Sequence, residues 1–258
     1  MTRRCAVGLF LIVTAALPVP GHAKTLIGIP QQKKVLVAGK HVTVHYLLYL
    51  PPGFQTDARR KWPLILFLHG STEKGDDLAV VKREGLPAYL EKVRNFPFVV
   101  ISPQLPADRE RWDPVELKAL LDAALPDLRI DRERIYLTGW SLGANGVWRL
   151  ATKYPDVFAA IAPVAGWGDA GMASALKNVP VWAFHGARDT NVLPRESSSM
   201  VDALRKSGDE VRFTLYPDLE HDCWMAAYRN GKLYEWFLQH HRVRIATGAG
   251  LRGQHVHK

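Results

Sequence analysis

The segment RIYLTGWSLGANG at residues 134–146 decides the fold of this chain. Its apolar part, IYLT at 135–138, is typical of a buried strand, and the part after the serine has helical spacing. Ser141 stands midway between Gly139 and Gly143 at the junction. Glycine inside an element costs about 0.5–1 kcal/mol relative to alanine, so this cluster requires a reason. The segment predicts a tight strand-to-helix turn that carries one serine.

Such a turn explains both the glycines and the serine. A tight turn forces the serine into a strained backbone conformation, and side chains at the flanking positions 139 and 143 would collide with neighbouring elements. The turn also raises the hydroxyl of Ser141 above the sheet and places the N–H of Leu142 at a helix N-terminus, where negative charge is favoured. We therefore predict that Ser141 is a nucleophile rather than an ordinary helix N-cap. Gly146 receives no explanation from the sequence.

A nucleophilic serine needs a base, and the base needs an acid that orients it. His221, in LEHDCW at 219–224, lies in a polar loop after the last predicted strand and is the expected base. Asp189, in HGARDTNVLP at 185–194, follows the preceding predicted strand and is the expected acid. The chain order serine, aspartate, histidine is typical of one hydrolase architecture.

Other acids and histidines are weaker candidates. Asp169 and Asp218 are substitutes for the acid, whereas Asp222 adjoins the base in sequence and would need an awkward geometry to orient its ring. His185 stands at a strand end before a glycine and is expected to be structural. Four further histidines do not complete a metal coordination shell, so neither a metal site nor any other cofactor is predicted. They are His240, His241, His255 and His257.

The oxyanion formed by attack on a carbonyl needs two hydrogen-bond donors. The N–H of Leu142 is the first. LFLHGSTEKGDD at 66–77, directly after an apolar run, is a glycine-containing loop whose backbone can face the serine, and we assign the second donor to the N–H of Ser71. His69 is expected to hold the shape of this loop rather than to act as a base.

Apolar runs and helical patterns alternate along the chain. Runs of four to eight apolar residues bounded by Gly and Pro are typical of strands buried on both faces. The predicted strands are 63–70, 98–104, 134–139, 158–166, 179–186 and 211–217, and the predicted helices are 115–128, 142–154, 197–208 (opened by capping serines) and 226–241 (with Gly231 as a break). The stretch at 33–54 predicts an antiparallel hairpin. The alternation implies a mostly parallel, doubly wound α/β sheet with helices on both faces.

The N-terminal segment has the pattern of a secretory signal peptide. Arg3 and Arg4 precede an apolar run, Cys5 to Leu17, which is too short to span a bilayer, and a small-residue site ends at Ala23. The paired arginines also suggest the twin-arginine route, but the residues after them lack the bulky apolar and basic character expected there. We predict cleavage after residue 23 and a periplasmic or secreted protein, without stable membrane insertion.

Composition bounds the rest of the chain. The 258 residues are 47% hydrophobic and 23% charged, which suits one globular domain, predicted over 24–240. Cleavage leaves Cys223 as the one cysteine, so no internal disulfide is expected, and lowers the net charge from +9 to +7. No basic stripe with interleaved aromatics is present, so nucleic-acid binding is not predicted. The stretch 241–258 is predicted to be a disordered basic tail, and the oligomeric state stays open.

Five segments carry a resemblance to a known family. They are YLLYLPPGF, PLILFLHGSTEKGDD, IYLTGWSLGANGVWRLATKYPDVFAAIAPVAG, VWAFHGARDTNVLP and TLYPDLEHDCW. Together they resemble the α/β-hydrolase superfamily from about residue 42 to 237. The likeness is greatest to the esterase branch with dienelactone-hydrolase-like, feruloyl-esterase and polyhydroxyalkanoate-depolymerase-like proteins and chains labelled predicted peptidases. The resemblance implies the nucleophile at Ser141, the acid at Asp189, the base at His221, and oxyanion donors at Leu142 and Ser71.

Expectations about substrate follow from the loops. Four tryptophans near the predicted site are expected to line the substrate pocket, with core packing as the competing account: Trp112, Trp140, Trp167 and Trp224. Only WGDAGMASALKN at 167–178 separates two predicted strands where lipases of this superfamily often insert a lid, so an open, shallow site without interfacial activation is expected.

The predicted function is hydrolysis of carboxylic esters, small or polymer-borne, through a Ser-His-Asp triad and an acyl-enzyme. Two alternatives stay open: a serine peptidase of the same fold, since esters and amides share the acylation chemistry, and a non-catalytic binding module that has kept the fold.

Overall fold

A computed structural model describes residues 31–38 and 42–242 of the chain. The predicted signal peptide, and the predicted tail from residue 243 onward, lie outside the described residues. Among the helices that are described, none combines the length and the apolar character needed to cross a membrane.

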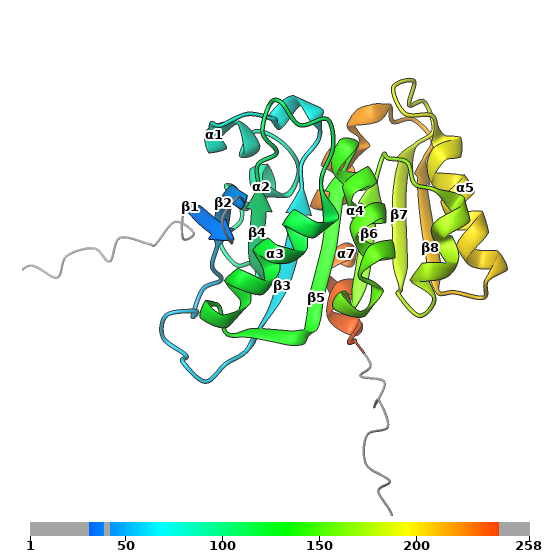
Figure 1. Cartoon of the computed structure of the whole chain (residues 1–258). Coiled ribbons are helices and arrows are strands. Elements are labelled where there is room, and N and C mark those ends of the chain that lie inside the picture. The colour runs from blue at the N-terminus through cyan, green and yellow to red at the C-terminus, as the bar shows by residue number, and fades with distance from the viewer. Residues whose placement is uncertain (1–30, 39–41, 243–258) are drawn as a thin grey trace, which may run out of the picture.

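An eight-stranded sheet forms the centre of the molecule (Figure 1), in the order β1-β2-β4-β3-β5-β6-β7-β8. β1 pairs antiparallel with β2, and β2 pairs antiparallel with β4, whereas every later pair is parallel. This confirms the mostly parallel sheet entered by an antiparallel hairpin. The strands are β1 (Gln32–Ala38), β2 (Val42–Tyr49), β3 (Trp62–Leu68), β4 (Val99–Pro103), β5 (Ile130–Trp140), β6 (Ala160–Val164), β7 (Val181–Gly186) and β8 (Val211–Tyr216).

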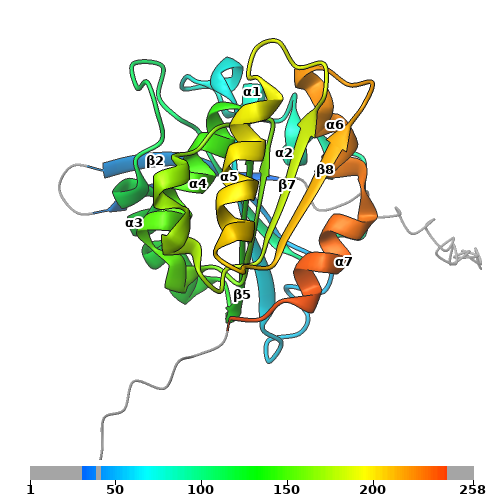
Figure 2. The ribbon, with the colours of Figure 1, turned by 90° about the vertical axis from the view of Figure 1, so that its right-hand side faces the viewer.

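Helices cover both faces of the sheet, as Figure 2 shows. One face packs against α3 (Pro114–Ala124), α4 (Leu142–Lys153) and α5 (Pro194–Lys206), and the other against α2 (Gly85–Leu90), α6 (Trp224–Arg229) and α7 (Gly231–Gln239). α1 (Leu78–Val81) packs beside β2. All residues of β3, β4 and β6 are buried, because both faces are covered, and this explains their continuous apolar runs.

Three helix boundaries differ from the sequence prediction. α5 begins at Pro194, which suits a first-turn position, so Ser197 lies inside the helix and the predicted serine cap is wrong. The predicted helix 115–128 becomes α3 and a 3-10 turn, η2 (Leu125–Asp127), because Pro126 has no N–H to continue the helix. The last pattern divides into α6 and α7, where the Asn230 side chain accepts a hydrogen bond from the N–H of Lys232 and caps the second helix.

The parallel strands bring the predicted site residues to one edge of the sheet. The turn that carries Ser141 follows β5, the loop with Asp189 follows β7, and the turn with His221 follows β8. The loop that begins at His69 follows β3 in the same direction. Carboxyl ends of parallel strands are where this architecture places its ligands.

Candidate active site

Ser141 sits on a strained turn between β5 and α4. Its φ of 53° and ψ of −119° lie in a region that residues with a side chain rarely adopt. Its N–H donates to the carbonyl of Val164 at 2.9 Å, which ties the turn to the end of β6. The predicted backbone strain is therefore present, and the serine side chain is only 8% exposed.

The glycines around the serine are required by close approach of the β3 end. A Cβ added at Gly139 would lie 2.6 Å from the carbonyl oxygen of Leu68, and one added at Gly143 would lie 2.0 Å from the same atom. Gly146, which the sequence left unexplained, faces the side chains of Trp112 and Leu68 at 2.8 and 2.9 Å. All three glycines thus allow α4 and β5 to pack against the loop after β3.

Replacement of Gly143 by alanine tests this packing. Because the added methyl group would meet backbone atoms that cannot rotate away, we expect the free energy of unfolding to fall by about 3 kcal/mol or more. Gly231→Ala is the matched control, since a Cβ there meets nothing within 4 Å, and within α7 it should leave stability unchanged or raise it by up to about 1 kcal/mol. Chemical denaturation measures both, and equal stability of the two variants would contradict the steric argument.

The side chains of Ser141, His221 and Asp189 form one hydrogen-bonded chain. His221 Nε2 lies 3.0 Å from Ser141 Oγ, and His221 Nδ1 lies 2.7 Å from Asp189 Oδ2. The other carboxylate oxygen, Oδ1, accepts the N–H groups of Asn191 and Val192, each at 2.9 Å. Asp189 is 2% exposed, so its charge is held by hydrogen bonds rather than by water.

The other acids and the terminal histidines lie in different arrangements. Asp169 caps η4 (Ala170–Leu176) by accepting the N–H of Gly171, and the exposed Asp218 pairs with Arg188 at 2.6 Å. Asp222 follows the histidine within η5 (His221–Cys223), but the carboxylate that contacts the ring belongs to Asp189. His240 faces the Trp236 carbonyl and Glu210. His255 and His257 lie outside the described residues.

His69 holds the loop after β3. Its Nε2 accepts the N–H of Leu105 at 3.0 Å, so Nδ1 carries the ring hydrogen and donates to the carbonyl of Gly70 at 2.6 Å. The His69 carbonyl in turn accepts the indole N–H of Trp112 at 3.3 Å. Burial lowers the pKa of His69 to about 4, which keeps the ring neutral. These contacts hold the shape of the loop, and none of them involves Ser141.

The sequence analysis missed a buried carboxyl group in the same loop. Glu73, 3% exposed, accepts the N–H of Gly70 at 3.0 Å and the hydroxyl of Thr72 at 2.6 Å. Gln104 donates to its carbonyl at 2.9 Å. Burial is the largest cause that raises the pKa of Glu73. An acid three residues after the loop glycine is the signal that could have identified it, because this is the spacing of a capping contact.

Two backbone N–H groups border the serine without an acceptor in their own helices. Leu142 is the first residue of α4, and Ser71 is the first residue of η1 (Ser71–Glu73). Both residues line the cavity that contains Ser141. Gly70 N–H, the neighbouring donor, is already taken by Glu73. The arrangement can therefore direct two donors toward an oxygen bound beside the serine.

The cavity at Ser141 has a volume of about 980 Å³ and an aromatic wall. Trp140, Trp167 and Trp224 line it. The rings of Trp140 and Trp224 stack with centroids 3.8 Å apart, and the Trp224 indole N–H donates to Glu84 at 3.1 Å. Three of the four predicted tryptophans thus face the cavity that holds the serine.

Trp112 lines the second cavity described below rather than the cavity at Ser141. Its side chain is 3% exposed and does not line the Ser141 cavity. Its ring packs edge-on against His69, with centroids 4.9 Å apart, and lies against Gly146. Trp112 is thus a packed side chain that also forms part of the wall of the second cavity.

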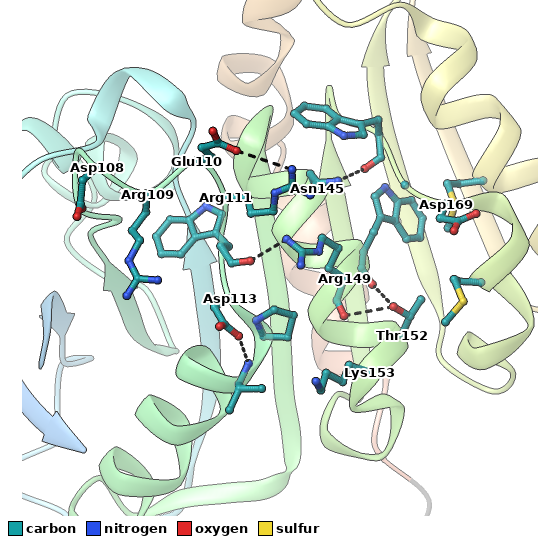
Figure 3. A pocket seen from close by; sticks show the side chains of 18 residues that line it. Asp108, Arg109, Glu110, Arg111, Asp113, Asn145, Arg149, Thr152, Lys153 and Asp169 are labelled. Atoms are coloured by element: carbon teal, nitrogen blue, oxygen red, sulfur yellow. Dashed lines mark hydrogen bonds and ion pairs between the residues drawn. The ribbon is translucent and has the colours of Figure 1, made fainter. Parts of the chain in front are cut away.

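A second cavity of about 1050 Å³ adjoins the first (Figure 3), and Glu110 and Trp167 line both. Asn145 donates to the carbonyl of Trp167 at 3.2 Å, and Arg149 donates to the carbonyl of Trp112 at 3.0 Å. α4 thereby fixes both loops that form the walls. Between β6 and β7, the position at which no lid was expected, the chain forms η4 and no other helix or strand.

In residues 31–38 and 42–242, no group of three or more His, Cys, Asp and Glu side chains is arranged to hold a metal ion.

Comparisons with known proteins find similar sequences among hydrolases. The prolyl oligopeptidase family model matches residues 170–243, which include both Asp189 and His221. Poly(3-hydroxyalkanoate) depolymerase C of Paucimonas lemoignei is 26% identical over 202 residues, or 60% of this chain and 46% of that protein. The bifunctional acetylxylan esterase/xylanase XynS20E of Neocallimastix patriciarum is 29% identical over 149 residues, or 54% of this chain and 21% of that protein. The aligned regions span less than half of either relative.

A solved structure is similar in fold to this chain. The crystal structure of a thermostable esterase superposes with a TM-score of 0.70 and 28% identity, covering 84% of this chain and 64% of the other. The sheet order, the strained serine turn after β5 and the order of serine, aspartate and histidine along the chain are shared features of one architecture. The chain has the α/β-hydrolase fold.

Proposed function

We propose that this protein hydrolyses carboxylic esters, with Ser141 as nucleophile, His221 as base and Asp189 as the acid that orients the base. The observation that carries the proposal is the hydrogen-bonded chain from Asp189 through His221 to Ser141, with 2.7 and 3.0 Å separations, at the wall of a large cavity. Nucleophile, base and orienting acid are the groups that acyl transfer requires. The esterase and depolymerase relatives support the same chemistry.

The first half of the reaction acylates the serine. His221 Nε2 takes the proton of Ser141 Oγ as Oγ attacks the ester carbonyl carbon, and the carbonyl oxygen becomes an oxyanion. The N–H groups of Leu142 and Ser71 donate to this oxyanion. The oxyanion then re-forms the carbonyl, the bond to the alcohol oxygen breaks, and His221 returns its proton to that oxygen.

The second half repeats these steps with water. His221 takes a proton from water as the hydroxide adds to the acyl carbonyl, and the same two N–H groups hold the second oxyanion. Collapse releases the acid, and the proton on His221 returns to Ser141 Oγ. Throughout, Asp189 accepts a hydrogen bond from the Nδ1–H of His221 and stabilises the imidazolium that forms twice in each turnover.

The cavities favour extended, uncharged or cationic esters. Three carboxylates and one ammonium line the Ser141 cavity, from Glu84, Glu110, Glu196 and Lys74. Arg111 and Arg195 lie 4.0 and 3.5 Å from Glu110 and Glu196 but do not line the cavity, so its wall presents mainly acidic groups and would weakly repel a substrate carboxylate. At about 980 Å³ this cavity is already as large as a site for a drug-sized ligand, and a second cavity continues past Trp167. A substrate longer than a short acyl ester can occupy both.

A substrate panel on the purified protein tests the proposal. It contains p-nitrophenyl butyrate, p-nitrophenyl hemisuccinate, an oligomeric ester and a peptide p-nitroanilide. We expect kcat/KM for the butyrate to exceed that for the peptide amide by about 100-fold or more, because the amide nitrogen is the poorer leaving group. The hemisuccinate should be about 3- to 10-fold poorer than the butyrate because of the cavity carboxylates. An amide turned over better than every ester would favour the peptidase alternative.

A variant in the second cavity tests whether long ester substrates bind there. Met172 is 50% exposed and lines only the second cavity, so Met172→Arg narrows that cavity without disturbing the core. The oligomeric ester should lose about tenfold in kcat/KM, whereas p-nitrophenyl butyrate should change less than about twofold. Equal effects on both substrates would show that the second cavity takes no part in binding.

We also propose that the protein is exported and then cleaved after Ala23. The proposal is supported by the charged, apolar and small-residue parts of residues 1–23, which lie outside the described residues. Expression with its own N-terminus in a Gram-negative host, followed by mass spectrometry, should give a mature chain that begins at Lys24 in the periplasm or medium. A full-length cytoplasmic product would contradict export.

A further inference from the structure

His185 is a second histidine on the carboxylate of Asp189. It lies in β7, and its side chain is completely buried. Its Nε2 is 3.1 Å from Asp189 Oδ2, the same oxygen that His221 Nδ1 contacts at 2.7 Å. The reaction derived above uses only the second of these histidines. The strand-end position led us to expect a purely structural residue, but this contact connects His185 to the group that orients the base.

The neighbours of His185 fix where its ring hydrogen lies. Nε2 faces Asp189 Oδ2 and, at 2.9 Å, the carbonyl of Val192, and both of these oxygens can only accept. A hydrogen must therefore sit on Nε2. Nδ1 lies 2.7 Å from the hydroxyl of Ser197, whose single hydrogen can go either to Nδ1 or to the carbonyl of Gly166 at 3.0 Å. Burial is the largest cause that lowers the pKa of His185, and a neutral ring with its hydrogen on Nε2 serves both acceptors around that nitrogen while Nδ1 accepts from Ser197.

The ring is also held in place from three elements. His185 itself ends β7, Ser197 lies on α5, and the Ser197 hydroxyl is 3.0 Å from the carbonyl of Gly166, just beyond β6. A buried side chain with both ring nitrogens bonded cannot turn without breaking these contacts. His185 therefore presents Nε2–H to Asp189 in a fixed direction.

We propose that His185 is a positioning residue for ester hydrolysis, which donates Nε2–H to Asp189 Oδ2 and so fixes the carboxylate and moderates the negative charge that it presents to His221. The inference rests on the proposed function. When the His185 contact is included, both oxygens of the Asp189 carboxylate have donors: two backbone N–H groups on Oδ1 and two imidazoles on Oδ2.

One other titratable side chain faces Asp189 at this point. It is Cys223, which is buried beside Gly186, and burial raises the pKa of its thiol to about 12. The thiol is therefore neutral at the pH values where the reaction is measured. Arg188, next to Asp189 in the chain, is turned to the exposed Asp218. Among the described residues, His185 and His221 are accordingly the two side chains that donate to the buried carboxylate.

Two amide variants separate the contacts of the two ring nitrogens. The side-chain nitrogen of Gln can occupy the place of Nε2, whereas that of Asn can occupy only the place of Nδ1. His185→Asn should lower kcat/KM for p-nitrophenyl butyrate by about 10- to 100-fold, and His185→Gln should recover most of that loss. In His185→Asn, Asp189 presents more negative charge to His221, which raises the pKa of the base. The acidic limb of the kcat/KM profile should then move to higher pH by about 0.5 to 1 pH unit.

Ser197→Ala is the structural control, because it removes the partner of Nδ1 and leaves the Nε2 contact in place. It should lower the melting temperature without moving the acidic limb. Acidic limbs that coincide in His185→Asn, His185→Gln and Ser197→Ala would overturn the proposal.

Nitrogen-15 NMR of the unaltered protein gives a test that depends neither on activity nor on the folding of a variant. Near pH 7, the His185 ring should carry hydrogen on Nε2. A ring with hydrogen on Nδ1 and a bare Nε2 would overturn the proposal. If the unaltered protein does not hydrolyse esters, the proposed function is rejected, but the NMR measurement still reports which nitrogen of His185 carries the hydrogen.

Discussion

Ser141→Ala should lower kcat for p-nitrophenyl butyrate by about 10⁴- to 10⁶-fold, since the Ser141 hydroxyl is the one that His221 Nε2 contacts on the cavity wall and the acyl-enzyme forms on it. The side chain is 8% exposed and its hydroxyl contacts His221, so alanine fits the same space. The melting temperature should stay within a few degrees of the unaltered protein, on the order of the shift from one surface substitution. Steady-state kinetics and a thermal melt measure the two quantities.

A covalent probe supplies the control. A fluorophosphonate should label the unaltered protein once, on Ser141, and should leave Ser141→Ala unlabelled. Turnover retained in the variant, or an adduct on another residue, would reject the nucleophile assignment. A chain that binds substrates without labelling would fit the alternative of a non-catalytic binding module.

Asp189→Asn should lower kcat by about 10³- to 10⁴-fold. An amide can present an N–H where the carboxylate accepts from His221 Nδ1, so the ring would change its tautomer and lose its base at Nε2. The negative charge that stabilises the imidazolium is lost as well. Kinetics at saturating substrate measure the effect.

Two other aspartates give matched controls for this substitution. Asp169→Asn and Asp218→Asn change an exposed helix cap and an exposed ion pair, and each should alter kcat by less than about twofold. The reverse ranking, with either control more damaging than Asp189→Asn, would move the acid to a different residue.

Local sequence patterns predicted much of this molecule because its sheet is covered on both faces. The run at 63–70 corresponds to β3 (Trp62–Leu68), in which every residue is buried, so apolar continuity and strand position coincide. The three residues at the strand ends, Ser141, Asp189 and His221, were brought together by topology alone. Parallel strands point their carboxyl ends to one edge, and the order of the strands then decides which loops are neighbours.

The remaining features depend on contacts between segments far apart in the chain. Trp112 follows β4 and was expected at the Ser141 pocket, but the loop folds back and packs the indole against His69, 43 residues earlier, so that it lines the second cavity instead. α2 lies on the apolar layer with α6 and α7, and its few residues have too little periodicity to be recognised alone. The contact between His185 and Asp189 is local in sequence, but it depends on a loop conformation in which the chain turns back on the end of β7, where the Asp189 N–H donates to the carbonyl of Gly186.

The stacked pair of Trp140 and Trp224 gives the molecule an optical property. Their rings lie 3.8 Å apart at an interplanar angle of 26°, both line the Ser141 cavity, and Trp224 contacts the edge of the His221 ring at a centroid distance of 5.5 Å. Two indoles this close share their excited states, and a ligand that enters the cavity changes the polarity around both. Ligand binding at the site should therefore change the intrinsic ultraviolet spectrum of these two tryptophans, so binding can be measured without a dye or a chromogenic leaving group.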